Sequence, residues 1–288
     1  MPNTNTLPTL NLVGAGRVGQ TLASLWQAQN NTFAIHDVLT TSLHSAQTAC
    51  GVIGAGRAVA HMQAMRDADV WMLAVPDAQL VTCALALAAA RLVRNNEPAA
   101  TAPRTSIVFH CSGALGASVL EPLAALGWQI ASAHCILSFA SAPAAVQQFP
   151  GTPCALEGDI IACDLLRPAF TAIGAKCFDV ASSNKLLYHA AAVFATNFLP
   201  VLQATAEDLW QATGLPAELI PALRASLLRN AVTNITTLGP QAALTGPAAR
   251  GDTAAINRQG DAVAHWDAPT GAAYAALSDL ALRLARRK

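Results

Sequence analysis

Five polar side chains in this 288-residue chain carry functional groups that can hold a small anion or move a proton: Ser112, His134, Lys185, His189 and Arg250. A hydroxyl or a guanidinium can bind a carboxylate, and an imidazole or an ammonium can donate a proton. Ser112, His134, Lys185 and Arg250 also have an ordinary structural interpretation. The elements expected to position them therefore decide what they can do.

Ser112 follows an apolar, strand-like run at residues 106–109. Its hydroxyl and the N–H of Gly113 would hold a substrate carboxylate at the end of that strand. The alternative is that Ser112 caps a helix predicted over residues 115–126.

Two histidines, His110 and His134, are expected at the ends of neighbouring strands. Either would serve as a proton donor near neutral pH, because an unperturbed imidazole titrates at about pH 6.5. A histidine that only bonds backbone carbonyls is the other interpretation of each.

Lys185 and His189 lie one turn apart near the start of a long predicted helix, residues 184–212, with Tyr188 beside them. An ammonium or imidazolium on that face would act as a general acid, a role worth about 10²- to 10⁴-fold in rate. A solvated helix start is the alternative for Lys185.

Arg250 lies in residues 245–252 (TGPAARGD), which are predicted to form a structured loop. Its planar fork suits a carboxylate or a phosphate, and Asp252 is near enough to orient it. A purely structural clasp between Arg250 and Asp252 is the alternative.

An apolar strand pattern at residues 10–13 runs into three glycines with the spacing GxGxxG (LNLVGAGRVG). In a dinucleotide-binding fold the first glycine permits the strand-to-helix turn, the second lets a pyrophosphate approach the backbone, and the third lets the helix pack on the strand. We therefore expect this turn to bind a dinucleotide through Gly14, Ala15, Gly16, Arg17, Val18 and Gly19.

A second strand-like run, residues 32–35, leads to Asp37. An acid about 20 residues beyond the glycine turn accepts hydrogen bonds from the adenosine ribose in such folds, although a cap or turn is the alternative here. The apolar run that ends in Val75 and Pro76 is expected to border the cofactor. A further glycine string, residues 51–57 (GVIGAGR), has no apolar strand before it and is predicted to be a loop.

The composition excludes several classes of protein. The chain is 53% hydrophobic and 12% charged, with a formal net charge of +0, which is typical of a globular protein of one large or two modest domains. The absence of a basic run argues against nucleic acid, and no uninterrupted apolar segment has the roughly 18 residues that span a bilayer. Because the N-terminal MPNTNTLPTL also lacks the features of a secretory signal, we expect a cytoplasmic protein with neither nucleic acid nor membrane as a partner.

The cysteines follow no metal-ligand spacing, and their number is odd. We interpret them as reduced thiols and expect neither disulfides nor a bound metal. The seven are Cys50, Cys83, Cys111, Cys135, Cys154, Cys163 and Cys177.

Strand-like and helix-like runs alternate up to about Ser182. This alternation predicts an α/β fold with a Rossmann-type, doubly wound parallel sheet over residues 1–182. Residues 183–288 show only helical patterns, which predict an all-helical domain for substrate binding and dimerisation. A cleft between the two domains, at the carboxyl ends of the strands, is the expected place for chemistry.

Six segments, taken in order, resemble a known family: LNLVGAGRVG, VWMLAVPD, HCSGALGASVL, AHCILSFA, KLLYHAAAVFATNFL and LTGPAARGD. They are similar to Rossmann-like oxidoreductases that carry a helical C-terminal domain of unknown function. Those proteins look like relatives of the 6-phosphogluconate and 3-hydroxyisobutyrate dehydrogenases, pyrroline-5-carboxylate reductase and ketopantoate reductase. The resemblance covers nearly the whole chain and implies a 6-phosphogluconate-dehydrogenase-like C-terminal domain.

The resemblance also implies site residues. In the hydroxyisobutyrate branch an acid after the second strand, a serine after the fifth strand, and a lysine four residues before an asparagine bind cofactor and substrate. These roles fall on Asp37, Ser112, Lys185 and His189, with a histidine in place of the asparagine. The cofactor implied is NAD or NADP. Asp37 favours NAD, because it would repel a 2′-phosphate. The alternative is NADP, with Arg17 or Arg57 reaching that phosphate.

The function implied is that of an NAD(P)-dependent dehydrogenase or reductase. It would pass a hydride between nicotinamide and a C=O or C=N carbon of a small carboxylic acid, with Lys185 or His189 as proton donor. Ser112, His134 and Arg250 would surround the substrate, and the helical domains would form a homodimer. A sensor or regulatory protein that binds NAD(P) without hydride transfer is the alternative.

Overall fold

The computed structural model describes residues 7–95 and 105–287. Residues 1–6 lie outside the described residues. They belong to the N-terminal segment that is predicted above not to be a secretory signal. The chain divides into two compact units, Met1–Thr196 and Asn197–Lys288. This division falls after helix α7 (Lys185–Ala192), whereas the sequence places the domain boundary before it.

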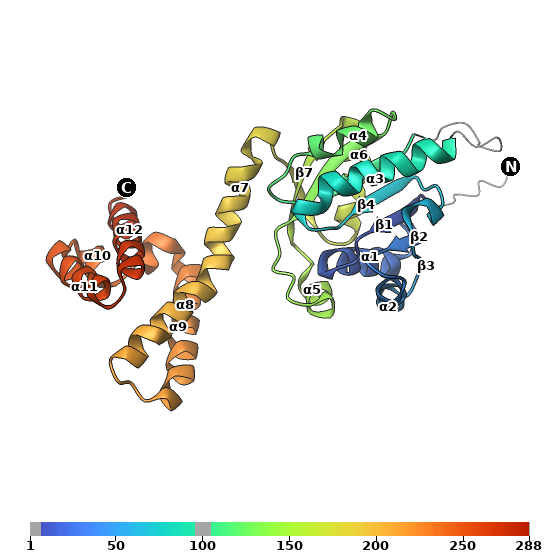
Figure 1. Ribbon diagram of the computed structural model, residues 1–288. Coiled ribbons are helices and arrows are strands. Elements are labelled where there is room, and N and C mark those ends of the chain that lie inside the picture. The colour runs from blue at the N-terminus through green and yellow to red at the C-terminus, as the bar shows by residue number, and fades with distance from the viewer. Residues whose placement is uncertain (1–6, 96–104, 288) are drawn as a thin grey trace. The chain divides into compact units, whose positions relative to one another are not determined.

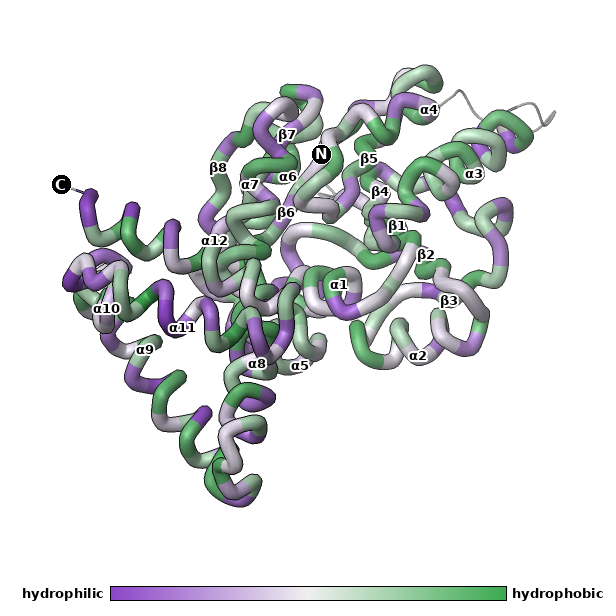
Figure 2. The backbone as a smooth tube through the Cα atoms, turned by 60° about the vertical axis from the view of Figure 1, so that its left-hand side comes forward, coloured by the Kyte–Doolittle hydropathy of each residue, from purple (hydrophilic) through white to green (hydrophobic). Residues whose placement is uncertain are grey.

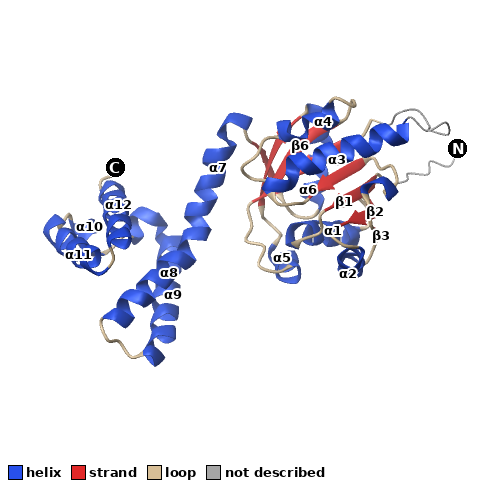
Figure 3. Ribbon diagram, in the orientation of Figure 1, coloured by secondary structure: helices blue, strands red, loops and turns tan. Residues whose placement is uncertain are grey.

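The described strands of the N-terminal unit form an eight-stranded sheet in the order β3-β2-β1-β4-β5-β6-β7-β8 (Figures 1 and 3). Only the β6–β7 pair is antiparallel. The order of the first six strands is that of dinucleotide-binding sheets, so the predicted doubly wound fold is confirmed. The strands are β1 (Thr9–Val13), β2 (Ala34–Leu39), β3 (Arg57–Val59), β4 (Val70–Leu73), β5 (Ile107–His110), β6 (Gln129–Cys135), β7 (Pro153–Gly158) and β8 (Lys176–Asp179).

Helices connect these strands, as βα alternation requires. The helices are α1 (Arg17–Gln29), α2 (Leu43–Ile53), α3 (Asp77–Asn95), α4 (Glu121–Ala124), α5 (Ala142–Gln148), α6 (Ile160–Ala172) and α7, with the 3₁₀ turns η1 (Met62–Ala64), η2 (Ala117–Leu120) and η3 (Ser182–Asn184). The glycine string at residues 51–57 was wrongly predicted as a loop. It holds the end of α2, the left-handed C-cap Gly54 (φ 79°) and the first residue of β3.

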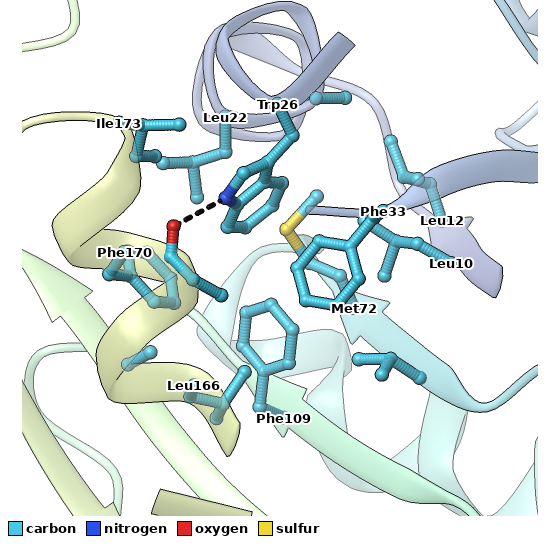
Figure 4. Packing of buried hydrophobic residues seen from close by; sticks show 14 of the residues in the cluster. Leu10, Leu12, Leu22, Trp26, Phe33, Met72, Phe109, Leu166, Phe170 and Ile173 are labelled. Atoms are coloured by element: carbon cyan, nitrogen blue, oxygen red, sulfur yellow. Dashed lines mark hydrogen bonds between the residues drawn. The ribbon is translucent and has the colours of Figure 1, made fainter. Parts of the chain in front are cut away.

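Alternate residues of each strand pack on opposite faces of the sheet. Leu10 and Leu12 pack in the cluster that α1, α2 and α6 cover, and Trp71 and Leu73 pack in the cluster that α3 and α4 cover. On the first face Trp26 meets the edges of neighbouring aromatic rings and donates from Nε1 to the carbonyl of Ala169 at 2.9 Å (Figure 4). These contacts hold α1, and with it the glycine turn at its start, firmly against the sheet.

The described residues of the second unit form helices and no strand (Figure 3). The elements from residue 193 on are the π-helical turn η4 (Val193–Asn197), α8 (Phe198–Ala212), the 3₁₀ turn η5 (Ala217–Leu219), α9 (Ile220–Ala243), α10 (Gly246–Arg250), α11 (Thr253–Trp266) and α12 (Ala268–Ala285). The loop predicted over residues 245–252 is wrong, because α10 occupies most of it.

Pro200 lies in the first turn of α8 and does not interrupt the helix. A proline has no N–H, and its ring collides with the carbonyl four residues earlier. The π-helical turn η4, which precedes α8, is the local change that accompanies it.

One helical stretch among the described residues, Ser182–Ala212, is long and apolar enough to cross a membrane by length and composition alone, with a mean hydropathy of 1.3. A single such stretch is weak evidence for a membrane-spanning helix. Its first helix, α7, contributes the buried Lys185 to the N-terminal unit. Hydrophobic segments continue along α8 and α9 (Figure 2).

Candidate functional site

A crevice of about 750 Å³ runs along the carboxyl ends of β1, β2 and β4. The β1–α1 turn lines it with Gly14, Ala15 and Gly16, and the end of β4 adds Val75 and Pro76. This is the position at which doubly wound sheets bind their ligands. The structure therefore brings these predicted cofactor residues together.

The glycines at the turn have separate physical reasons. Gly14 has φ 84°, and a Cβ there would lie 2.6 Å from the carbonyl oxygen of Ala74, so no other residue fits. A Cβ on Gly19 would lie 2.8 Å from the carbonyl oxygen of Gly14, which shows how closely α1 packs on the turn. A Cβ on Gly16 would meet nothing within 4 Å.

Gly16 is also the N-cap of α1, and no side chain caps that helix. The first turn of α1 contains no acidic residue. Uncapped N–H groups at a helix N-terminus bind anions, because they carry unsatisfied donors and the positive end of the helix dipole. The open surface at Gly16 and the uncapped helix thus fit the pyrophosphate of a dinucleotide.

Two other residues of the turn point elsewhere. Arg17 donates from Nη1 to the carbonyl of Phe139 at 3.3 Å, and Val18 lines a second, smaller pocket described below. Both therefore lie toward the β5–β6 side of the turn.

Asp37 does not line the crevice, which corrects its expected role as the ribose ligand. Its side chain is fully buried, and the carboxylate accepts from Arg57 Nη2 at 2.8 Å and from Arg66 Nη2 at 2.6 Å. Burial acts to raise the pKa of this carboxyl, but the hydrogen bonds from Arg57 and Arg66 outweigh it and hold the pKa at about 2. The inferred preference for NAD loses its basis, since Asp37 faces the two arginines.

A β-bulge explains the position of Asp37. Leu10 pairs with Ile35 and Leu12 pairs with Val38, so two residues of β2 stand opposite Asn11 alone. The buried Asn11 side chain accepts from the N–H of Asp37 at 2.9 Å. Asn11, a polar residue inside an apolar strand, is the sequence signal that could have revealed this irregularity.

Strand β2 ends at Leu39, and the residues that follow it form the end of the crevice beyond β2. Thr40, Thr41, His44 and Ser45 line this end and were missed by the sequence reasoning. None of the crevice-lining residues that the structure describes is acidic. Hydroxyl and imidazole groups there can bond either ribose hydroxyls or a phosphate.

A second pocket of about 210 Å³ lies at the ends of β5 and β6. Cys111, Ser112 and Gly113 follow β5, His134 lies within β6 one residue before its end, and His189 comes from α7. Sequence neighbours line both cavities: Pro76 borders the crevice and Asp77 the pocket. The pocket therefore adjoins the crevice at the residues that follow β4.

The hydroxyl of Ser112 has no capacity left for a ligand. It donates to Asp77 Oδ2 at 2.7 Å and accepts from the N–H groups of Ala114 and Leu115 at 3.2 and 3.0 Å. One donor and two acceptors complete its hydrogen bonding. Ser112 thus caps the following turn and does not hold a substrate carboxylate through its hydroxyl. The helix predicted over residues 115–126, which Ser112 was alternatively expected to cap, is replaced by the 3₁₀ turn η2 and the short helix α4.

Lys185 is 1% exposed, which corrects the idea of a solvated helix start. Its Nζ donates to the carbonyl of Ser112 at 3.1 Å and to the hydroxyl of Ser132. Burial lowers the pKa of this amine. Lys185 does not line the pocket. Its hydrogen bond to Ser112 fixes the turn after β5 from outside the pocket.

His134 and His189 meet around Gly113. The two imidazole centroids lie 5.6 Å apart, and a Cβ on Gly113 would lie 2.5 Å from His189 Nδ1 and 2.8 Å from His134 Nε2. Only a glycine leaves room for both rings. His134 Nδ1 bonds the hydroxyl of Tyr188 at 2.8 Å, whereas His189 Nδ1 is buried with no hydrogen-bond partner among the described residues.

His110 is satisfied inside the protein. It is fully buried, Nε2 bonds the carbonyl of Gly116 at 3.0 Å, and Nδ1 accepts from the N–H of Ser112 at 3.1 Å. Burial lowers its pKa to about 4. Its role is therefore to shape the β5 turn, and the proton-donor alternative does not hold.

Arg250 is the last residue of α10 in the helical unit. The clasp with Asp252 does not form, because the Asp252 carboxylate caps α11 by accepting from the N–H of Ala255 at 2.9 Å. Arg250 is exposed within its unit and stays a predicted carboxylate ligand.

Two domain models match the chain: a Rossmann-like domain over residues 5–135, and a domain of unknown function (DUF2520) over residues 152–281. No curated protein matches it.

Solved structures share the fold. They include protein TM1727 from Thermotoga maritima (24% identity, TM-score 0.73, covering 96% of this chain and 98% of that one) and BF3122, a suspected NADP oxidoreductase from Bacteroides fragilis (19%, 0.71, 96% and 98%). A pyrroline-5-carboxylate reductase from Streptococcus pyogenes is also similar (13%, 0.59, 96% and 99%).

Proposed function

We propose that this chain, which joins a Rossmann-like domain to a DUF2520 domain, is an NAD(P)-dependent oxidoreductase. It would pass a hydride between nicotinamide and a C=O or C=N carbon of a small carboxylic acid. The names of the solved neighbours, an NADP oxidoreductase and a pyrroline-5-carboxylate reductase, support this class of reaction.

The observation that carries the proposal is the uncapped N-terminus of α1 at Gly16, open to a crevice whose neighbouring pocket holds two imidazoles. The first feature fits a pyrophosphate and the second fits a group that accepts or loses a proton. The bound cofactor would supply or accept the hydride.

The roles proposed for the side chains follow from their contacts. Because Lys185 is buried and does not line the pocket, the role of proton donor passes from Lys185 to the pocket histidines, His134 and His189. Arg250 is the proposed ligand of the substrate carboxylate, since a guanidinium can donate two parallel hydrogen bonds to a carboxylate.

A titration of the purified protein with NADH and with NADPH, followed by nicotinamide fluorescence, tests the cofactor site. We expect both to bind, and NADPH at least as tightly as NADH, because no acidic side chain lines the described crevice. Gly16→Ala should weaken binding at least about tenfold, since its methyl group would project toward the phosphates without disturbing the packed protein.

Gly51→Ala is the matched control, because a Cβ there also meets nothing within 4 Å but lies in α2. Binding of neither nucleotide to the wild-type protein would refute the oxidoreductase proposal. Binding with no turnover on a panel of keto, hydroxy and imino acids would favour an NAD(P) sensor instead.

A further inference from the structure

Tyr188 lies outside the residues that the motifs single out for chemistry, yet it makes the polar contact that fixes His134. We propose that Tyr188 is a positioning residue that holds His134 with its proton on Nε2, and that this Nε2–H is the hydrogen-bond donor offered to the oxygen or nitrogen of the C=O or C=N group that is reduced in the pocket. The second clause rests on the proposed function. The first is a property of the protein alone.

Tyr188 holds the ring of His134 in position through a hydrogen bond and a ring contact. Tyr188 Oη lies 2.8 Å from His134 Nδ1, and the two rings are nearly perpendicular, with centroids 5.5 Å apart. Phe178 packs against Tyr188 with centroids 6.1 Å apart, so the phenol is held as well. The tautomer of a histidine is set by the partner of its other nitrogen, which here is the phenol.

The opposite edge of the imidazole faces the pocket. His134 Cε1 and Nε2 would lie 2.7 and 2.8 Å from a Cβ on Gly113, so the missing side chain of Gly113 leaves this edge free. His134 and Gly113 both line the pocket, whereas Tyr188 does not. The phenol therefore bonds the rear nitrogen and leaves Nε2 for a ligand.

Burial, with the charges around it, keeps His134 neutral. Burial lowers its pKa to about 4, and His189, Lys185 and His110 act in the same direction, against Asp77. Burial also raises the pKa of Tyr188, so its hydroxyl stays protonated. His134 Nδ1 is the hydrogen-bond partner that the structure gives this hydroxyl, and donation to it pairs the phenol O–H. With Nδ1 accepting, the single proton of the neutral ring belongs on Nε2.

A neutral Nε2–H suits a carbonyl or imine acceptor. Negative charge develops on the oxygen or nitrogen as a hydride reaches the neighbouring carbon, and a fixed donor stabilises that charge without rearranging. Lys185 does not take this place, because it is buried and does not line the pocket.

The first test is imidazole NMR on the full-length protein labelled with ¹⁵N-histidine, with His134→Gln to assign the signal. We expect His134 to carry its proton on Nε2 and to remain neutral from pH 5.5 to 8. Tyr188→Phe should redistribute the proton between the two nitrogens. Tyr274→Phe, which removes the hydroxyl of the other tyrosine, bonded to Gln259 far along the chain, should leave the signal unchanged.

A proton on Nδ1 in the wild-type protein, or an unchanged His134 signal in Tyr188→Phe, would overturn the positioning role. This readout needs no cofactor, so it stands even if nucleotide titration refutes the proposed function. Addition of NADP⁺ should shift the Nε2 signal of His134 more than that of His265, which lies in the helical unit.

Kinetics on the first substrate found separates donation from structure. We expect His134→Ala to lower kcat about 10²-fold and His134→Gln, which keeps an N–H near Nε2, to restore part of it. Tyr188→Phe should lower kcat about tenfold in the wild-type background and not at all in His134→Ala, because its effect passes through His134. Additive losses, or losses confined to KM, would overturn the donor role.

Discussion

At the residue scale, the side chains that look most chemical in the sequence are mostly employed in holding the site together. Asp37 binds two arginines, Ser112 caps a turn, and Lys185 bonds the backbone of Ser112 from behind. The polar side chains that line the pocket beside Ser112 are the imidazoles of His134 and His189, the Asp77 carboxylate and the thiols of Cys111 and Cys135. The residue types in the sequence therefore indicated the location of the site more reliably than the side-chain groups that act in it.

Asp37→Asn should leave the ratio of NADH to NADPH affinity unchanged, since Asp37 does not line the crevice. It should lower the free energy of unfolding by about 1–3 kcal/mol, because charged hydrogen bonds to Arg57 and Arg66 are weakened. Urea unfolding and nucleotide titration measure the two effects.

Thr41→Asp is the companion variant, because it places a carboxylate in the crevice end where Asp37 was expected to act. It should weaken NADPH relative to NADH. A tenfold loss of NADH affinity in Asp37→Asn, with unfolding unaltered, would return the ribose role to Asp37.

At the element scale, the turn after β5 depends on the neutral form of His110. Protonation of Nδ1 would break its bond from the N–H of Ser112, and burial lowers its pKa to about 4. Between about pH 6.5 and 4 the unfolded chain binds a proton that the folded protein does not. Stability is thus full above pH 6.5 and falls as the pH falls toward 4, with His134 acting in the same sense.

Urea denaturation at pH 7.5 and 4.5 should show this loss, to which His110 contributes about 3 kcal/mol. His110→Gln, although less stable at pH 7.5, should lose less stability on acidification than the wild-type protein. His265→Gln is the control. A wild-type stability that is level across this pH range would contradict the assignment.

At the scale of the whole molecule, the helical unit exposes apolar side chains along α8 and α9. Those at least two-fifths exposed are Phe198, Val201, Leu202, Leu227, Val232, Ile235 and Leu238. Exposed apolar side chains that gather into a patch mark an interaction site, and the helical pattern predicts a homodimer. We propose a second copy of this chain as the partner, with these side chains at the interface.

Light scattering after size exclusion should show a dimer of the wild-type protein at micromolar concentration. Ile235→Glu should dissociate it, because a charge would be buried in the interface. Val52→Glu, on α2 and equally exposed at 49%, should remain dimeric. A monomeric wild-type protein, or an Ile235→Glu dimer of unchanged affinity, would refute this interface.

Two parts of the fold depend on local pattern and could be predicted from the sequence. The spacing of Gly14, Gly16 and Gly19 predicted the β1–α1 turn, and the change from alternating to purely helical runs predicted a Rossmann-type sheet followed by helices. Both outcomes follow from backbone sterics and the periodicity of burial, which neighbouring residues alone dictate.

Which polar groups remain available for a ligand depends on long-range contacts in the folded protein. The bulge opposite Asn11 turned Asp37 toward Arg57 and Arg66, and the packing of α7 buried Lys185 and brought Tyr188 to His134. Hydrogen bonds between residues 50 or more positions apart leave no periodic signal in a sequence. A buried polar group must nevertheless find its partner in the fold, and here the partners found decide which residues are left for chemistry.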